Sequence, residues 1–248
     1  MPSVRSRTAA RSLNLLLNAL SPKEYDDIRP LLDIVTLDAR RVLHNPGEPA
    51  KYVYFPRAGF LSIAIVLENG AMVEVATIGR EGMAGVTAKG PGRGGMTDTL
   101  VVVQGSNAYR MRVADFHSEM GRCGAFMELI NNYSEAFLGV LMQSTGCNAA
   151  HSVEQRLAKW LLMAHDRMEA EEFSITQEFV AMMLGATRQT VTGVAGSLQK
   201  AGLIRYHRGR VRILDRAGLE EASCECYRVS TNLLRSAIPR TRSRPRAK

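Results

Sequence analysis

The sequence predicts an α+β fold, with short antiparallel strands in the first half of the chain and helices in the second. Two observations lead to this fold class. From Leu31 to about Val113, short runs of β-branched and aromatic residues alternate with turn residues. From Ala114 onward, apolar residues recur at spacings of three and four, which is the period of an amphipathic helix. A chain of 248 residues is long enough for one or two domains.

The strand-rich region predicts an antiparallel β-sandwich or jelly roll, preceded by short helices. We refer to this predicted domain as a β-roll. Residues 13–20 are expected to form the first helix. Ser21-Pro22-Lys23-Glu24 predicts the start of the second, because serine caps helices, proline fits the first turn and glutamate fits the third position. Asn69-Gly70 predicts a hairpin turn, since both residues tolerate positive φ. Residues 88–98 are glycine-rich and are expected to form a loop. The expected strands fall within residues 35–43, 51–56, 60–67, 71–78 and 99–104.

A long helix is predicted after the strands. Phe126, Ile130, Tyr133, Phe137 and Val140 lie at spacings of 4, 3, 4 and 3, which is a heptad seam. Such a seam lets one helix pack against its copy, so these five residues are the expected homodimer interface. The alternative is that the same face packs on the strand domain of its own chain.

Two short helices joined by a glycine are predicted in the C-terminal third, after a helix over about 152–168. Thr176 is expected to cap a helix that ends at Leu184, Gly185 to make the turn, and Thr187 to cap the next helix. This arrangement predicts a helix-turn-helix. The apolar side chains expected in its shared core are Val180, Leu184, Val191, Val194 and Leu198.

The polar start of the second helix and the segment after it predict contact with DNA. Arginine and glutamine early in a recognition helix hydrogen bond base edges in the major groove, each worth about 1–3 kcal/mol of discrimination. After Gly202, alternation around Arg208-Gly209 predicts a basic β-hairpin, or wing, although by itself such a hairpin could simply be solvated. The expected DNA contacts are Thr176, Gln177, Thr187, Arg188, Gln189, Thr192, Lys200, Arg205, Arg208 and Arg210.

The basic charge is local, which fits a polyanionic partner. The formal net charge is +8. Residues 188–216 contain seven basic side chains against Asp215 alone, and residues 235–248 contain six with no acid. Clustered positive charge attracts nucleic acid.

The cysteines and the apolar runs of the sequence indicate in which compartment the protein is expected. Cys123, Cys147, Cys224 and Cys226 are too sparse for a disulfide scaffold and fit a reducing cytoplasm, where we expect the protein. No uninterrupted apolar run is long enough to span a membrane, so a membrane partner is not expected.

The segments VEQRLAKWLL (153–162) and ITQEFVAMMLGATRQTVTGVAGSLQKAGLI (175–204), with the strands and long helix before them, resemble the Crp/Fnr superfamily of bacterial transcription regulators. The resemblance covers most of the chain. It implies a homodimer on a pseudo-palindromic DNA operator, with half-sites about one helical turn apart. It also implies a β-roll that senses an effector, and RNA polymerase as a further partner. The implied domains are a β-roll at 13–122, a dimerisation helix at 123–151, a winged helix-turn-helix at 152–219, and a C-terminal helix with a basic tail at 220–248.

The recognition helix departs from the family's best-known pattern, which begins Arg-Glu-Thr-Val and has a later arginine. Here the run is Arg188-Gln189-Thr190-Val191, and Gly193 replaces the later arginine. We therefore expect a different operator sequence, read mainly by Arg188 and Gln189.

The resemblance places the effector pocket at Glu81, Gly82, Met83 and Arg93. Cyclic-nucleotide sensors of the family bind ribose and phosphate through a Gly-Glu-Leu stretch and a later Arg-Ser or Arg-Thr. This chain has no acid at the ribose-binding place, and no serine or threonine follows Arg93. The effector is therefore unknown, and cyclic nucleotide is not the expected one. The alternative is a cAMP-dependent activator of the same fold.

Metal cofactors are not expected either. An iron–sulfur sensor needs four thiolates, with a close N-terminal cluster that this chain lacks. Cys147 and His151 share a helix face, as metal ligands often do, but they continue the expected dimer seam, so packing is the favoured interpretation.

Two other classes of protein are disfavoured. A jelly-roll metalloenzyme needs a His-x-His pair and further ligands in the strands, where only His44 is present, so we do not expect an enzyme. A membrane-surface adaptor held by the basic tail is the other alternative. That tail contains Pro239 and Pro245 and lacks an apolar face.

Overall fold

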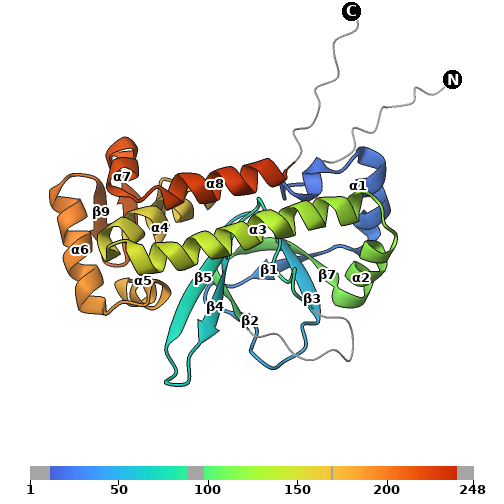
Figure 1. Ribbon diagram of the computed structural model, residues 1–248, viewed down its shortest axis with the longest axis horizontal. Helices are drawn as coiled ribbons and strands as arrows, with labels where there is room; N and C mark the ends of the chain where they lie inside the picture. Colours follow the sequence, from blue (N-terminus) through green and yellow to red (C-terminus); the bar gives the residue numbers. More distant parts are fainter. Residues whose placement is uncertain (1–11, 89–97, 169, 239–248) are drawn as a thin grey trace, which may run out of the picture.

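The computed structural model describes residues 12–88, 98–168 and 170–238, in which a long central helix joins a β-roll to a helical C-terminal unit (Figure 1). The chain starts with η1 (Leu17–Ala19), α1 (Pro22–Ile28) and η2 (Arg29–Leu31). Ser21 and Glu24 form the reciprocal capping box that the sequence predicts. The helix predicted at 13–20 is only one 3₁₀ turn. Its backbone is diverted by the buried Asn14, whose amide donates to the carbonyls of Pro56 and Gly82, both at 2.9 Å.

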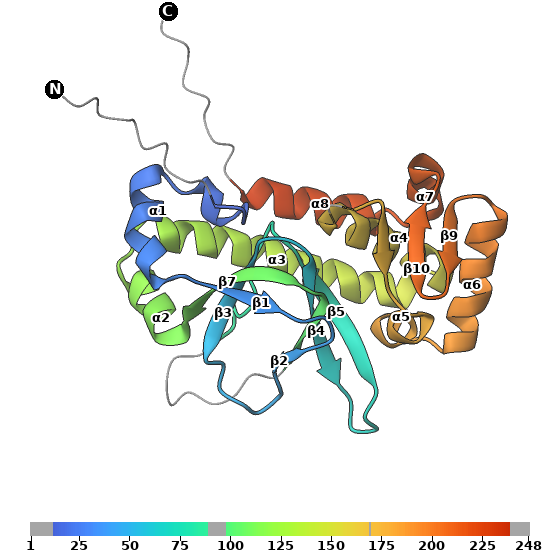
Figure 2. The same ribbon diagram turned by 180° about the vertical axis from the view of Figure 1, so that it is seen from behind.

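The β-roll consists of two antiparallel sheets (Figure 2). One has the order β1-β7-β3 and the other the order β2-β6-β4-β5. Between β4 and β5, Gly70 has a φ of +79°, in agreement with the predicted hairpin. The strands are β1 (Asp33–Leu37), β2 (Val42–His44), β3 (Tyr52–Pro56), β4 (Phe60–Val66), β5 (Met72–Ile78), β6 (Thr99–Gln104) and β7 (Ser106–Arg112).

Two strand predictions are wrong. The single strand expected at 35–43 is divided into β1 and β2, and Arg40 between them has a φ of +67°, which breaks an extended chain. Ser106–Arg112, which is not among the expected strands, is the central strand of its sheet and pairs with both β1 and β3. Most of the predicted loop at 88–98 lies outside the described residues.

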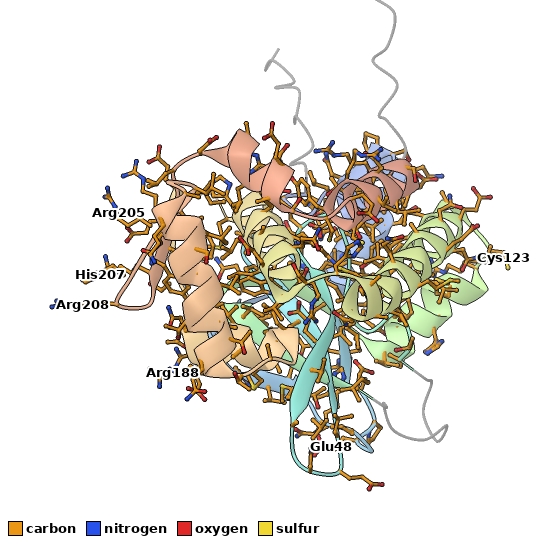
Figure 3. The ribbon with its side chains drawn as sticks, turned by 60° about the vertical axis from the view of Figure 1, so that its left-hand side comes forward. Glu48, Cys123, Arg188, Arg205, His207 and Arg208 are labelled. Atoms are coloured by element: carbon orange, nitrogen blue, oxygen red, sulfur yellow. The ribbon has the colours of Figure 1, made fainter. Side chains whose placement is uncertain are left out.

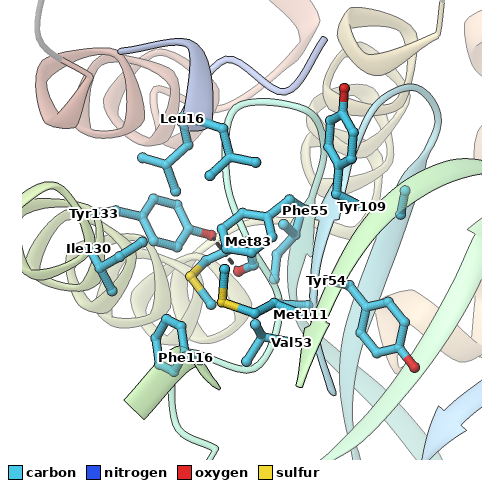
Figure 4. Packing of buried hydrophobic residues seen from close by; sticks show 14 of the residues in the cluster. Leu16, Val53, Tyr54, Phe55, Met83, Tyr109, Met111, Phe116, Ile130 and Tyr133 are labelled. Carbon is cyan, nitrogen blue, oxygen red and sulfur yellow. Dashed lines mark hydrogen bonds between the residues drawn. The ribbon is translucent and has the colours of Figure 1, made fainter. Parts of the chain in front are cut away.

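The predicted dimer seam faces the chain's own core. After α2 (Val113–Gly121), helix α3 (Ala125–Ala150) crosses the β-roll, and the five seam residues are 1–6% exposed. Tyr133 is among the largest of these side chains, and its hydroxyl donates to the Met83 carbonyl at 3.1 Å (Figure 4). Assigning Phe126, Ile130, Tyr133, Phe137 and Val140 to a dimer interface is therefore wrong, because the β-roll of the same chain covers them.

The C-terminal unit follows α4 (Val153–Arg167), which Ser152 and Gln155 cap reciprocally. Its small sheet has the order β8-β10-β9. The last helix, α8, turns back from this unit and lies along α3 (Figures 1 and 2). The elements are β8 (Glu172–Ser174), α5 (Gln177–Leu184), α6 (Arg188–Lys200), β9 (Ile204–His207), β10 (Arg210–Ile213), α7 (Arg216–Ala222) and α8 (Cys226–Ala237).

The C-terminal unit packs directly on the β-roll. Phe60, from β4, belongs to the hydrophobic core of the C-terminal unit and meets Trp160 edge to face at 6.0 Å. The Trp160 indole also donates to Glu74 of β5 at 2.9 Å. Arg167, at the end of α4, pairs with Glu81 after β5 at 2.7 Å. None of the helices in the described ranges is long and apolar enough to cross a membrane.

Candidate nucleic-acid interface

Helices α5 and α6 form the predicted helix-turn-helix. The Thr176 hydroxyl accepts from Phe179 N at 3.2 Å, and the Thr187 hydroxyl accepts from Thr190 N at 3.2 Å, so both predicted caps are present. Gly185 between the helices has a φ of +59° and a ψ of +39°. A side chain other than glycine's would strain this left-handed turn.

An apolar core fixes how the two helices cross. The side chains of Val180 and Val191 are fully buried, and Leu198 is nearly so. Ala181, also buried, is small at a position facing this core. Val194, expected in the core, is only partly buried. This packing leaves the opposite side of α6 in solvent.

The exposed start of α6 carries the predicted base-reading side chains. Arg188 is 69% exposed, and its guanidinium lies 3.7 Å from the equally exposed Glu178 carboxylate. An ion pair in such exposure holds the side chain weakly, so Arg188 can turn to another acceptor. Gln189 is exposed beside it. One turn later, the Thr192 hydroxyl donates to Gln177 Oε1 at 2.7 Å and joins the polar starts of both helices.

The predicted wing is the β9–β10 hairpin. Arg208 and Gly209 have φ values of +47° and +75°, the pair of positive angles found in a type I′ turn. Arg205, His207 and Arg208 project from the same side of the molecule as Arg188 (Figure 3). The wing and the recognition helix therefore present one positively charged surface.

Two wing arginines have acidic neighbours in or next to β8, a strand that no local sequence pattern predicts. Arg210 lies 3.3 Å from Glu172, and Arg212 lies 2.5 Å from Glu171. Strand β8 is only three residues long and has no turn signal before it, so its pairing with β10 is a tertiary effect. Lys200, at the far end of α6, is exposed.

Most residues expected to line the effector pocket are instead buried in the core or bonded to other residues of the chain. Met83 is fully buried, and a Cβ at Gly82 would lie 2.4 Å from the Tyr133 hydroxyl. The Glu81 carboxylate accepts from Arg167 Nε at 2.9 Å and from Gly79 N at 3.0 Å. The pocket prediction is wrong for Gly82 and Met83, which belong to the core, and Arg93 lies outside the described residues.

A cavity of about 260 Å³ lies on the other side of Glu81, between the β-roll, α4 and α8. Its lining combines basic, acidic and apolar residues, among them Arg80, Arg167, Arg235, Glu81, Asp166, Leu15 and Leu234. No local sequence pattern predicts this cavity, because its wall comes from four separate segments.

Cys147 and His151 also differ from expectation. They face α8 rather than a second copy of α3, and Cys147 Sγ lies 3.6 Å from Cys224 Sγ. Cys123 is exposed at the other end of α3.

The fold and this interface match known proteins. Residues 155–222 match the family model described as the Crp-like helix-turn-helix domain. The chain is 33% identical over 79 residues to the transcriptional regulator SdrP of Thermus thermophilus, a match that covers 29% of this chain and 39% of that protein's length.

Solved structures extend the match beyond the helix-turn-helix. A protein from Eubacterium rectale assigned to the Crp/Fnr family of transcriptional regulators superposes with a TM-score of 0.61 at 20% identity, over 84% of this chain and 96% of that one. The c-di-GMP responsive global regulator CLP of Xanthomonas campestris superposes with a TM-score of 0.59 at 13% identity, over 78% and 99% of the two chains.

Proposed function

We propose that the chain is a transcription regulator of the Crp/Fnr type that acts as a homodimer and reads a pseudo-palindromic DNA operator. Within it, residues 13–122 form the sensor, 123–151 the dimerisation helix, 152–219 the DNA-binding unit, and 220–248 the C-terminal helix and tail. RNA polymerase is the further partner that we propose.

The observation that carries this proposal is the shared exposure of the α6 start and the wing. Arg188 and Gln189 sit at the helix end that enters the major groove in helix-turn-helix proteins, where they can pair with guanine and adenine. Arg205 and Arg208 project from the same side of the molecule as Arg188 (Figure 3) and can meet the flanking phosphates, together with Thr176, Gln177, Thr187, Thr192, Lys200 and Arg210. The first pair supplies specificity, and the others supply affinity that depends on salt.

The proposed dimer uses a different face of α3 from the one first expected. Leu138 and Met142 are 57% and 68% exposed, which is unusual for such large apolar side chains on a central helix. Exposed residues Asn131, Glu135, Thr145 and Ala149 continue this face at spacings of three and four. A second copy packed along it would bury both side chains in a parallel helix pair.

We propose that DNA binding does not require cAMP. The segment that would hold the ribose is closed by Tyr133, and Glu81 is already paired with Arg167. The cavity on the other side of Glu81 is the candidate effector site, and its lining combines Arg80, Arg167 and Arg235 with the carboxylates of Glu81 and Asp166.

The test is fluorescence anisotropy on a duplex selected from a random pool, against a scrambled duplex, with and without cAMP. Arg188→Ala should reduce the specific-to-scrambled affinity ratio by about 5- to 150-fold, the loss of 1–3 kcal/mol of base discrimination. Arg208→Ala should instead weaken binding to both duplexes and reduce the salt slope by about 1.

Arg122→Ala is the matched control, since Arg122 is 67% exposed and lies next to Cys123, far from the interface. An affinity ratio that Arg188→Ala leaves unchanged would refute the assignment of α6 as the recognition helix. Selective binding that appears only with cAMP would support the alternative, a cAMP-dependent activator.

A further inference from the structure

The geometry points to a metal site at the junction of α3, α4 and α8, built from Cys147, His151, Cys224 and Cys226 and suited to one Zn²⁺ ion. One ligand atom from each residue can be chosen so that all four lie within 4.8 Å of one another. They come from the end of α3, from the connection between α7 and α8, and from the first residue of α8.

The distances match a single tetrahedral ion. Cys147 Sγ and Cys224 Sγ are 3.6 Å apart, and Cys226 Sγ and His151 Nδ1 are also 3.6 Å apart. A tetrahedral zinc with Zn–S bonds of about 2.3 Å separates two sulfurs by about 3.8 Å. These two separations therefore need to change by only a few tenths of an ångström, and the other pairs lie within 4.8 Å. A disulfide would need its sulfurs to approach to about 2.05 Å.

The chemistry of the four groups also selects zinc. Three thiolates and one imidazole form one of the common structural zinc sets, Cys₃His. The three cysteines are 0–3% exposed, so the ion would be closed off from solvent on their side. A site with four protein ligands leaves no open coordination position, which is the mark of a structural rather than a catalytic zinc.

A second layer of contacts orients the ligands. His151 Nε2 lies 3.3 Å from Glu225 Oε2, which leaves Nδ1 directed toward Cys226. A carboxylate on the other ring nitrogen is the usual support of a histidine that binds metal. The Gln143 amide donates to Cys226 Sγ at 3.0 Å, as a hydrogen bond to a thiolate would require. Simple thiol packing needs neither contact.

The position gives the ion a mechanical role. His151 ends α3, and the next residue, Ser152, caps α4. An ion held there would fasten α8 and the α3–α4 turn together, and so fix the C-terminal unit to the central helix. Metal binding itself does not depend on the proposed DNA-binding function, and the test below does not measure DNA affinity.

The experiment uses the full chain, stripped with a chelator under reducing conditions and titrated with Zn²⁺ and with Co²⁺. We expect one ion per chain by elemental analysis. The cobalt form should show the visible absorption of a tetrahedral centre and thiolate-to-cobalt charge transfer. This cobalt spectrum needs no variant, so it stands even where a variant folds poorly.

Four variants locate the site. Cys226→Ser and Cys224→Ser should abolish stoichiometric uptake, whereas Cys123→Ser, which changes an exposed thiol outside the cluster, should retain it. Glu225→Gln should weaken zinc affinity about 10- to 100-fold, since it removes only the support of His151. Zinc should also raise the melting temperature of the wild-type chain, but not that of Cys226→Ser.

Three results would overturn the proposal. The first is no uptake by the reduced wild-type chain at micromolar free zinc. The second is uptake that survives both cysteine substitutions in the cluster. The third is a cobalt spectrum without thiolate bands. A Cys147–Cys224 disulfide found by mass spectrometry, together with failure to bind zinc after reduction, would assign the cluster to redox chemistry instead.

Discussion

Replacing Arg167 with methionine should loosen the C-terminal unit from the β-roll. The Arg167 side chain is 6% exposed and lies between these two parts of the chain. It donates to Glu81 from Nε at 2.9 Å and from Nη2 at 2.7 Å, and to the Met163 carbonyl at 2.9 Å. Methionine keeps the apolar length of this side chain and removes all of these donors.

The size of the loss in unfolding free energy depends on the Glu81 carboxylate, which the substitution leaves without its partner. A charge-assisted hydrogen bond contributes about 1.5–3 kcal/mol, and removing one partner of a buried ion pair costs about 3–5 kcal/mol. The Glu81 side chain is 19% exposed and borders the cavity, so water can reach the carboxylate that remains. We therefore expect Arg167→Met to lower the free energy of unfolding by about 3 kcal/mol, near the lower end of that range.

Urea unfolding at one fixed protein concentration measures this loss, because the stability of the proposed dimer would depend on concentration. Glu81→Gln/Arg167→Met completes a double-mutant cycle, and the coupling energy should be about 1–3 kcal/mol. The double variant should be more stable than Arg167→Met alone, since no unpaired carboxylate remains. A loss below about 0.5 kcal/mol for Arg167→Met, or no measurable coupling, would refute the view that this pair holds the two parts together.

Three further predictions concern other parts of the molecule. Burial raises the pKa of Glu74 to about 7, so the fold favours its protonated form. The free energy of unfolding should then fall by up to about 3 kcal/mol as pH rises from about 4.5 through 7. Glu74→Gln should flatten this pH dependence, as measured by urea unfolding at several pH values. The same pH dependence in the variant and the wild-type chain would contradict the prediction. Met142→Glu should weaken the proposed dimer at least about tenfold in sedimentation equilibrium without unfolding the chain, and unchanged dimerisation would place the interface elsewhere. Gly82→Ala should cost about 1–3 kcal/mol of stability by overpacking against Tyr133. Tyr133→Phe added to it should restore part of that loss in thermal unfolding, and no recovery would mean that the clash is relieved in another way.

Local signals in the sequence predicted the parts of the fold that depend on neighbouring residues. The caps at Ser21, Ser152, Thr176 and Thr187 need only a hydroxyl and the next turn of backbone, so they appear where predicted or as the start of a predicted helix. The turn at Gly185 needs only a residue that tolerates positive φ. The exposure of Arg188 at the start of α6 follows from the helical period alone, once the caps at Thr176 and Thr187 are known.

Partners distant in sequence could not be predicted in the same way. The spacing of Phe126 and its neighbours reveals an apolar stripe, but an apolar stripe fits a β-roll as well as a second helix. The cysteine cluster depends on α8 returning to the end of α3, and no local pattern near Cys224 encodes that return. The position of Arg167 against Glu81 is likewise a result of tertiary packing, 86 residues apart in sequence.

The return of α8 to α3 affects how the chain folds during its synthesis. Cys147 and Cys224 are 77 residues apart, and Gln143 and Cys226 are 83 residues apart. At ribosomal rates of about 5–20 residues per second, α3 leaves the ribosome on the order of 4–15 s before the helix that covers one of its sides. Throughout that interval Cys147 and the α8-facing side of α3 are open to solvent, chaperones or another nascent copy. These contacts are non-local, so they slow folding and make the docking of α8 a late step, after the β-roll and the helix-turn-helix unit have formed.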